Sequence, residues 1–207
     1  VNNKEKSINK SLMKVVLQDS FLQNKKILEI SNQISKYIPP QINEQFLKGN
    51  YTSQISTKRK KLTIFFSDIK NFTVTSENLQ PEDLTKYLNE YFSEMTAIAL
   101  KYGATIDKYI GDAMMLFFGD PESHGVEEDA KACLKMALAM QERMKILQEK
   151  WKKQGFAEPF QVRIGINTGY CNVGNFGSDQ RLSYTIIGGE VNICLLYTSD
   201  AADESDR

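Results

Sequence analysis

After residue 61 the spacing of apolar residues alternates between short continuous runs, typical of strands, and helical periodicity. This alternation constrains the fold more than any other feature. Short runs rich in β-branched and aromatic residues predict strands at 62–67, 105–109, 113–118, 160–167, 170–176 and 182–187. Two longer segments, 81–102 and 127–151, carry apolar residues at helical period. The order β-α-β-β-α-β-β-β predicts an α+β sandwich, with helices on one face of a mainly antiparallel sheet.

The N-terminal part of the chain predicts a helix followed by a connector. Apolar residues in 5–36 recur mostly at steps of three, four or seven, which fits either an interfacial helix or a plain amphipathic one. Pro39-Pro40 stops this helix, and 41–47 can form a second short one. The polar, basic stretch 51–61 predicts a linker. We divide the chain into a helical linker or signalling segment (1–50), a compact domain (51–193) and a tail (194–207).

Charge and composition exclude several classes of partner. The chain of 207 residues has 26 basic and 26 acidic residues, so no net charge steers it to nucleic acid or to an anionic membrane. No apolar run approaches the ~18 residues of a membrane span, and no signal peptide is visible. The three cysteines form no C-x-x-C pair, which favours a reducing compartment and gives no support for zinc. We expect a cytoplasmic domain, or the cytoplasmic part of a larger membrane-bound protein with an upstream sensor.

Two aspartates each follow a strand directly. Asp68 ends the run at 62–67, and Asp112 lies in the hairpin signal Ile110-Gly111-Asp112. Either aspartate alone is a common capping or turn residue. Together they favour a sharper interpretation, because a strand end and a hairpin tip can converge, and two carboxylates at one point would hold Mg²⁺. Two such ions can clamp the attacking and departing oxygens of a displacement at phosphorus.

Four motifs, in order, resemble those of the class III adenylate and guanylate cyclases. Residues 66–73, Phe-Ser-Asp-Ile-Lys-Asn-Phe-Thr, resemble the family's F-x-D-I-x-x-F-T motif. Residues 108–112 resemble its K-x-x-G-D motif, and the second aspartate lies 112 − 68 = 44 residues after the first, as in the family. Residues 162–169 and 184–192 resemble its R-I-G-I-x-x-G and Y-x-x-x-G-x-x-V-N segments. The resemblance covers about 35–193 and implies a ferredoxin-like class III cyclase domain preceded by an N-terminal helix.

This resemblance implies an adenylate cyclase that converts ATP to 3′,5′-cyclic AMP and pyrophosphate. It assigns Asp68 and Asp112, with the carbonyl of Ile69, to two Mg²⁺ or Mn²⁺ ions per site, which activate the ribose 3′-hydroxyl. Independently of the resemblance, residues 69–73 lead from a turn toward a helix, whose first backbone N–H groups suit a polyphosphate, so Phe72 and Thr73 are candidate substrate-binding residues. In this family the metal aspartates come from one chain and the base-reading residues from the other, so a homodimer is implied as well.

The base-reading positions implied by the resemblance are Lys108 and Thr185, and Asn192 orients the ribose. Adenine offers an acceptor at N1 and an amino donor at N6, which a lysine and a threonine oxygen can match, whereas guanine reverses that edge. Guanylate cyclases of the family typically carry Glu where Lys108 stands. Threonine at 185 resembles the subgroup that includes bicarbonate-responsive enzymes, so a bicarbonate response is a further expectation.

The chain departs from the family pattern after Asn192. The family carries an arginine four residues later, where this chain has Leu196, so we expect impaired catalysis by the chain as written. The segment from Cys194 resembles translated sequencing-adapter read-through, which predicts a non-native tail and an incomplete domain. A genuine divergent tail is the alternative.

Other functions compete with catalysis on the same fold. A non-catalytic regulatory or dimerisation domain is the main alternative, favoured by Leu196 and opposed by the presence of every metal and base position. Diguanylate cyclase is suggested by Gly188-Gly189-Glu190, but Val191-Asn192 replaces the Glu-Phe of that signature. Production of cyclic nucleotide from ATP and from GTP discriminates these functions.

Overall fold

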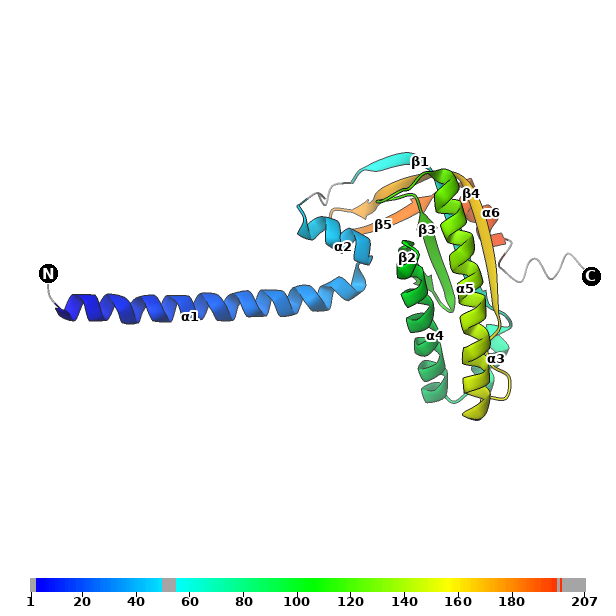
Figure 1. Cartoon of the computed structure of the whole chain (residues 1–207), viewed down its shortest axis with the longest axis horizontal. Helices are drawn as coiled ribbons and strands as arrows, with labels where there is room; N and C mark the ends of the chain where they lie inside the picture. Colours follow the sequence, from blue (N-terminus) through cyan, green and yellow to red (C-terminus); the bar gives the residue numbers. More distant parts are fainter. Residues whose placement is uncertain (1–2, 50–54, 197, 199–207) are drawn as a thin grey trace, which may run out of the picture.

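The computed structural model describes residues 3–49, 55–196 and 198. A long helix, α1 (Asn3–Ile34), projects away from the rest of the molecule (Figure 1) and agrees with the helix predicted at 5–36. The short η1 (Ser35–Tyr37) and α2 (Pro40–Leu47) follow it. Pro40 begins α2, where its restricted φ suits the first helical turn. The tail predicted at 194–207 lies largely outside the described residues.

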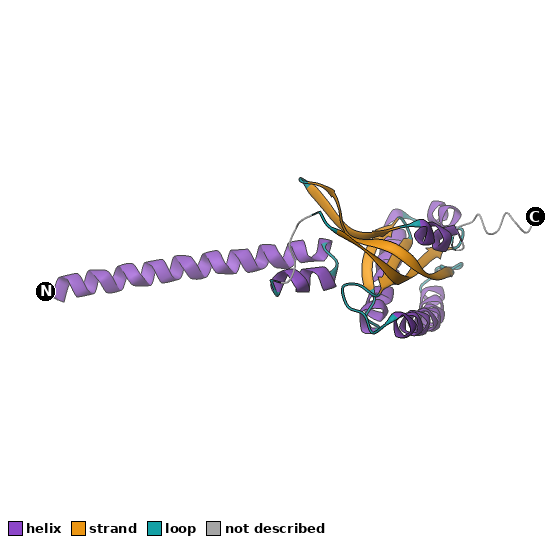
Figure 2. Ribbon diagram, turned by 90° about the horizontal axis from the view of Figure 1, so that it is seen from above, coloured by secondary structure: helices purple, strands orange, loops and turns teal. Residues whose placement is uncertain are grey.

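Five antiparallel strands form one sheet in the order β2-β3-β1-β4-β5. Their bounds are β1 (Thr57–Ile69), β2 (Thr105–Ile110), β3 (Ala113–Phe118), β4 (Val162–Ser178) and β5 (Arg181–Ile187). Figure 2 shows a strongly twisted sheet beside the helices. The central strand β1 contains residues 62–67, all of them buried, because helices cover both faces of the sheet there.

Two helices cover one face of the sheet. They are α4 (Pro81–Lys101) and α5 (Val126–Lys153), which lie side by side (Figure 1) and agree with the predicted helices. Their core includes Phe65 of the sheet, Tyr91 of α4 and Trp151 of α5, each 0% exposed. Burial of such large aromatic side chains is the main source of cohesion in this layer. The short α3 (Phe72–Asn78) connects β1 to α4.

The second face is also covered, contrary to the prediction of helices on one face only. The helix α6 (Gly189–Leu196) packs there against β4 and β1. Its Cys194 joins a second buried cluster with Ile64 and Phe66 of β1. Because neighbouring residues of a strand point to opposite faces, the unbroken apolar run of β1 requires a cover on each side.

Two predicted strands, 160–167 and 170–176, prove to be one continuous strand of 17 residues, β4. The break predicted between residues 167 and 170 does not occur, because Gly169 pairs with Leu62 inside the β1–β4 ladder. A Cβ at Gly169 would lie 2.4 Å from Cγ of Glu190 in α6. The glycine therefore makes room for a side chain of the covering helix and does not turn the chain.

The predicted linker 51–61 is partly wrong, because β1 begins at Thr57. The basic residues 58–61 pair with β4 and extend the central strand beyond its buried part. Arg59 places its guanidinium 5.4 Å from the centre of the Tyr170 ring on β4. Lys60 forms an ion pair with Asp120. Pairing with β4 and these two contacts keep the basic segment in a strand, although its composition alone predicts a linker.

The three cysteines, Cys133, Cys171 and Cys194, are buried and free. Burial raises the pKa of Cys133 to about 12, so its thiol is a packing group. None of the helices in the described ranges is long and apolar enough to cross a membrane.

Candidate active site

The two aspartates singled out in the sequence meet at one end of the central strand. Asp68 is the penultimate residue of β1, and Asp112 lies in the turn between β2 and β3. Because Ser67 pairs with Met114 across β1 and β3, the hairpin tip falls beside the end of β1. The backbone N–H of Ile69 donates to Oδ2 of Asp112 at 3.0 Å, which fixes the second carboxylate against the first strand.

The electrostatics of this pair suit a cation. Burial, followed by the neighbouring Asp68, raises the pKa of Asp112 to about 6. Two carboxylates this close repel each other, and a positive ion between them would relieve that repulsion. The Ile69 N–H donates to Asp112 and the Arg163 guanidinium donates to Asp68, and a carboxylate has further acceptor positions for a ligand. Among the residues that the structure describes, no group of three or more His, Cys, Asp or Glu could hold a metal, so any ion here would rest on this pair, backbone and substrate.

Lys108 and Thr185 come together although they lie on opposite edges of the sheet. Lys108 belongs to β2 and Thr185 to β5, and the twist of the sheet (Figure 2) allows the two edges to approach. The Lys108 ammonium donates to Oγ1 of Thr185 at 3.0 Å. The pair that the sequence predicts as base-reading residues is therefore one hydrogen-bonded unit in a single chain.

Asp107 is a site residue that sequence reasoning missed. The pairing of β2 with β3 shifts register between Ile106 and Lys108, so Asp107 is the extra residue of a β-bulge. Its side chain is 0% exposed, and its Oδ2 accepts the Thr185 hydroxyl at 2.6 Å. Burial raises the pKa of Asp107, while the hydrogen bond from Thr185 and the Lys108 ammonium lower it. An aspartate inside a predicted strand, where aspartate is disfavoured, was the available signal.

The remaining predicted site residues are more dispersed. Asn192 is exposed on α6, at the second face of the sheet. Phe72 is half-buried at the start of α3, with its ring centroid 6.1 Å from that of Phe160, and the adjacent Thr73 is exposed. Ile69 is buried beside the carboxylates. Leu196, in the arginine position of the family, is exposed at the last residue of α6.

Two contacts position α6, and with it Asn192, on the sheet. Asn167 of β4 donates through Nδ2 to Oε2 of Glu190 at 2.7 Å and to the Glu190 carbonyl at 3.1 Å. The thiol of Cys194 lies 3.6 Å from the carbonyl oxygen of Ile64. These contacts set where the first and last turns of the helix lie on β4 and β1.

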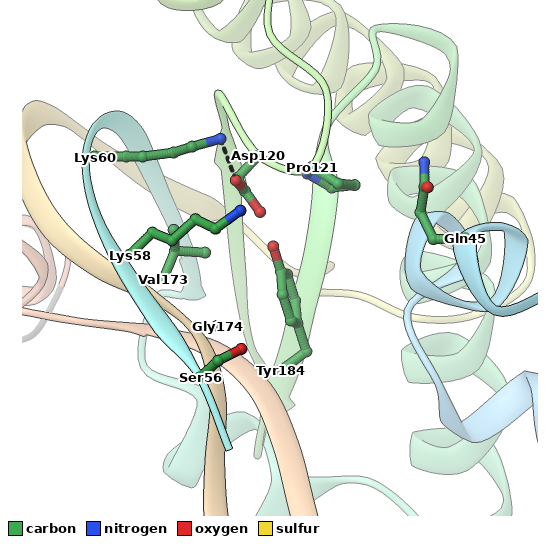
Figure 3. Close-up of a pocket in the computed structure, with 9 residues that line it drawn as sticks. All are labelled: Gln45, Ser56, Lys58, Lys60, Asp120, Pro121, Val173, Gly174 and Tyr184. Atoms are coloured by element: carbon green, nitrogen blue, oxygen red, sulfur yellow. Dashed lines mark hydrogen bonds and ion pairs between the residues drawn. The ribbon is translucent and has the colours of Figure 1, made fainter. Parts of the chain in front are cut away.

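A separate pocket lies between the start of β1 and the loop after β3 (Figure 3). Lys60 contacts the carboxylate of Asp120 there, and Lys58 extends into the same space. Tyr184 of β5 closes one side. The pocket contains none of the predicted site residues, so its presence adds nothing to the assignment of the carboxylate and Lys108–Thr185 sites.

The fold of this chain is similar to those of solved nucleotide cyclases. The chain is similar to the adenylyl cyclase CyaB from P. aeruginosa, with a TM-score of 0.68 and 55% identity over 70% of this chain and 74% of that one. It is also similar to the guanylyl cyclase Cya2, with a TM-score of 0.64 and 36% identity over 68% of this chain and 70% of that one. The class that the fold defines is therefore the class III nucleotidyl cyclases.

The family model for the adenylate and guanylate cyclase catalytic domain matches residues 55–205. This chain belongs to that family. The adenylate cyclase of Anabaena cylindrica is 31% identical over 87% of this chain, and adenylate cyclase 1 of Rhizobium meliloti (strain 1021) is 29% identical over 76%. The chain spans 35% and 23% of the lengths of those two relatives.

Proposed function

We propose that this domain is an adenylate cyclase, which converts ATP to 3′,5′-cyclic AMP and pyrophosphate. The observation that carries the proposal is the 3.0 Å hydrogen bond between Lys108 and Thr185, a donor and an acceptor side by side. Adenine presents the complementary acceptor and donor on its Watson–Crick edge. Solved neighbours include a rhodopsin-guanylyl cyclase core with converted specificity in complex with ATPαS, so both bases fit this fold and local side chains must choose between them.

Asp68 and Asp112 are the proposed ligands of two Mg²⁺ or Mn²⁺ ions, with the Ile69 carbonyl assisting. The ions, when present, would polarise phosphate oxygens and favour the attacking form of the ribose 3′-hydroxyl. The protein's own contribution is to hold the two carboxylates at one point, through the Ile69 N–H and the Arg163 guanidinium. The half-buried Phe72 and the exposed Thr73 follow at the start of α3, where we propose contact with the triphosphate.

We further propose a homodimer in which each active site is shared. Exposed apolar side chains on β4, β5 and α6, including Tyr170, Ile187 and Ile193, offer surface for a second copy. The proposal places the metal carboxylates of one chain opposite Lys108, Thr185 and Asn192 of the other. A solved neighbour is described as a non-canonical dimeric guanylyl cyclase domain, so a domain of this fold can dimerise, and the arrangement of the two chains is part of our proposal. Because cyclic AMP acts as a messenger made from cellular ATP, we place the domain in the cytoplasm, in a signalling role.

The test is nucleotide cyclisation by the purified chain, with ATP and GTP compared in Mg²⁺ and in Mn²⁺. We expect cyclic AMP, with ATP preferred over GTP. We expect turnover below that of a family member with arginine at the position of Leu196, because a guanidinium in comparable sites contributes roughly 10³–10⁵ in rate. Nucleotide binding and dimer formation without any cyclic product would instead favour a regulatory domain of the same fold.

A further inference from the structure

We propose that Asp107 determines base specificity by fixing the direction in which the Thr185 hydroxyl forms hydrogen bonds. This inference rests on the proposed function, in which Lys108 and Thr185 contact the base. Threonine is an ambiguous reader, because its hydroxyl can donate to one ligand and accept from another. A neighbouring residue that accepts the hydrogen bond from the threonine hydroxyl would leave the threonine oxygen able only to accept.

The surroundings of Asp107 leave its carboxylate facing donors on both sides. Its Oδ2 accepts the Thr185 hydroxyl at 2.6 Å and faces the backbone N–H of Ile186 at 3.4 Å. Its Oδ1 lies 3.3 Å from the ammonium of Lys108. An ionised carboxylate has no proton to donate, so Asp107 can only accept hydrogen bonds from these neighbours. The β-bulge leaves Asp107 without a partner in the β2–β3 ladder, and its carboxylate contacts Thr185 and Ile186 of β5.

Thr185 and Lys108 both keep hydrogen-bonding positions for a ligand after their mutual contacts are made. Thr185 has one proton, which goes to Asp107, and two lone pairs, one of which receives Lys108. It keeps one acceptor position. Lys108 has three protons, one of which goes to Thr185, and its ammonium forms an ion pair with Oδ1 of Asp107 at 3.3 Å, so it keeps a donor for the base. The network therefore presents one donor and one acceptor to the base.

This arrangement matches adenine and mismatches guanine. The free Lys108 proton suits the N1 acceptor of adenine, and the free Thr185 lone pair suits its N6 amino group. Guanine carries a proton on N1 and an acceptor oxygen at position 6. The Lys108 donor would therefore face the N1 donor, and the Thr185 acceptor would face the acceptor oxygen. Without Asp107, the Thr185 hydroxyl could rotate and donate to the guanine oxygen, and the discrimination would weaken.

The experiment compares kcat/KM for ATP and for GTP in the full chain and in Asp107→Asn. The amide keeps the shape of Asp107 but replaces one carboxylate oxygen with an NH₂ donor. Depending on the orientation of the amide, that donor then faces either the Thr185 hydroxyl or the Lys108 ammonium. We expect the ATP:GTP ratio to fall about tenfold or more, the scale of one mismatched hydrogen bond. Asp120→Asn is the matched control, since it also removes a carboxylate paired with a lysine, and it should leave the ratio unchanged. An equal fall for both substrates would mean that Asp107 only supports the sheet, and would overturn the proposal.

A second arm asks whether Asp107 acts through Thr185. In a Thr185→Val background there is no hydroxyl to orient, so Asp107→Asn should change the ATP:GTP ratio by less than about twofold. The same fall in both backgrounds would overturn the proposal, because it would place the effect on Lys108 or on the sheet.

Calorimetric binding of α,β-methylene-ATP and α,β-methylene-GTP separates this inference from the proposed enzyme activity. If the wild type prefers the adenine analogue and Asp107→Asn loses the preference, the inference holds even when no cyclic product forms. If the preference survives in Asp107→Asn, the inference fails while the proposed activity stands. A wild type that binds neither analogue would overturn the inference together with base reading.

Discussion

Asp68 and Arg163 face each other across the β1–β4 ladder, and Nη2 of Arg163 lies 2.8 Å from Oδ2 of Asp68. The register of two antiparallel strands thus orients a carboxylate that we propose to bind metal. Arg163 belongs to the segment that resembles the R-I-G-I-x-x-G motif of the family, whereas Asp68 belongs to another motif. Two motifs that are distant in sequence therefore support one another at the end of the central strand.

Replacing either carboxylate should abolish catalysis without unfolding the domain. Asp68→Asn and Asp112→Asn each remove a negative charge from a site proposed to hold two divalent ions, so we expect kcat to fall by at least about a hundredfold. Cyclic AMP formation measures the loss, and circular dichroism checks the fold. Asp120→Asn, a carboxylate outside the site, should keep its activity. Turnover near that of the wild type in either site variant would refute the metal assignment.

Lys108→Glu should redirect the base preference. It replaces the donor facing adenine N1 with an acceptor, so ATP use should drop by orders of magnitude while GTP use drops far less. Steady-state kinetics with both nucleotides give the ratio. Lys101→Glu, on the exposed last turn of α4, makes the same charge change elsewhere and should leave the ratio unaltered. An unchanged ratio in Lys108→Glu would count against base reading by this residue.

A mixture of two inactive chains should recover activity if each site is shared. Asp68→Ala lacks a proposed metal ligand, and Asn192→Ala lacks the proposed ribose contact on α6. In a heterodimer one of the two sites would draw an intact half from each chain, so up to half of the wild-type activity per heterodimer should return. Size-exclusion chromatography with two different tags shows whether heterodimers form. Heterodimers without recovered activity would contradict the shared site.

Gly165→Ala should displace α6 from the sheet. A Cβ at this position would lie 2.8 Å from the backbone oxygen of Cys194 and 2.8 Å from Cγ2 of Thr198, so helix backbone has to move. Overpacking of this kind costs about 1–3 kcal/mol, which lowers the melting temperature by several degrees. Turnover should fall too, because Asn192 moves with the helix.

Gly189→Ala is the matched control, since a Cβ there meets nothing within 4 Å. Alanine at the start of α6 should leave the melting temperature unchanged or slightly raised. Thermal unfolding of both variants gives the comparison. Equal melting temperatures for the two would show that α6 does not pack on Gly165 in solution.

Local patterns predicted the elements well where a residue's own chemistry decides the conformation. The helix predicted from Pro81 does begin there, and the Gly111-Asp112 turn joins β2 to β3, as their backbone preferences suggest. Local patterns failed around Gly169, where the sequence predicts a break between two strands and the structure has the continuous strand β4. What matters there is the space that Glu190 needs, and that space is created by a helix some twenty residues further along the chain.

The sequence by itself determined the class of protein. Each of the motifs around Asp68, Lys108 and Asn192 is a contiguous run of residues, so it can be recognised without knowledge of the fold. Only the tertiary structure decided how Asp107 enters the site. Its neighbour Lys108 is adjacent in sequence, but Thr185 lies on the opposite edge strand and is brought within 2.6 Å by the twist of the sheet and a bulge of one residue. Hydrogen-bond direction depends on which atoms meet in space, and a linear pattern does not contain that information.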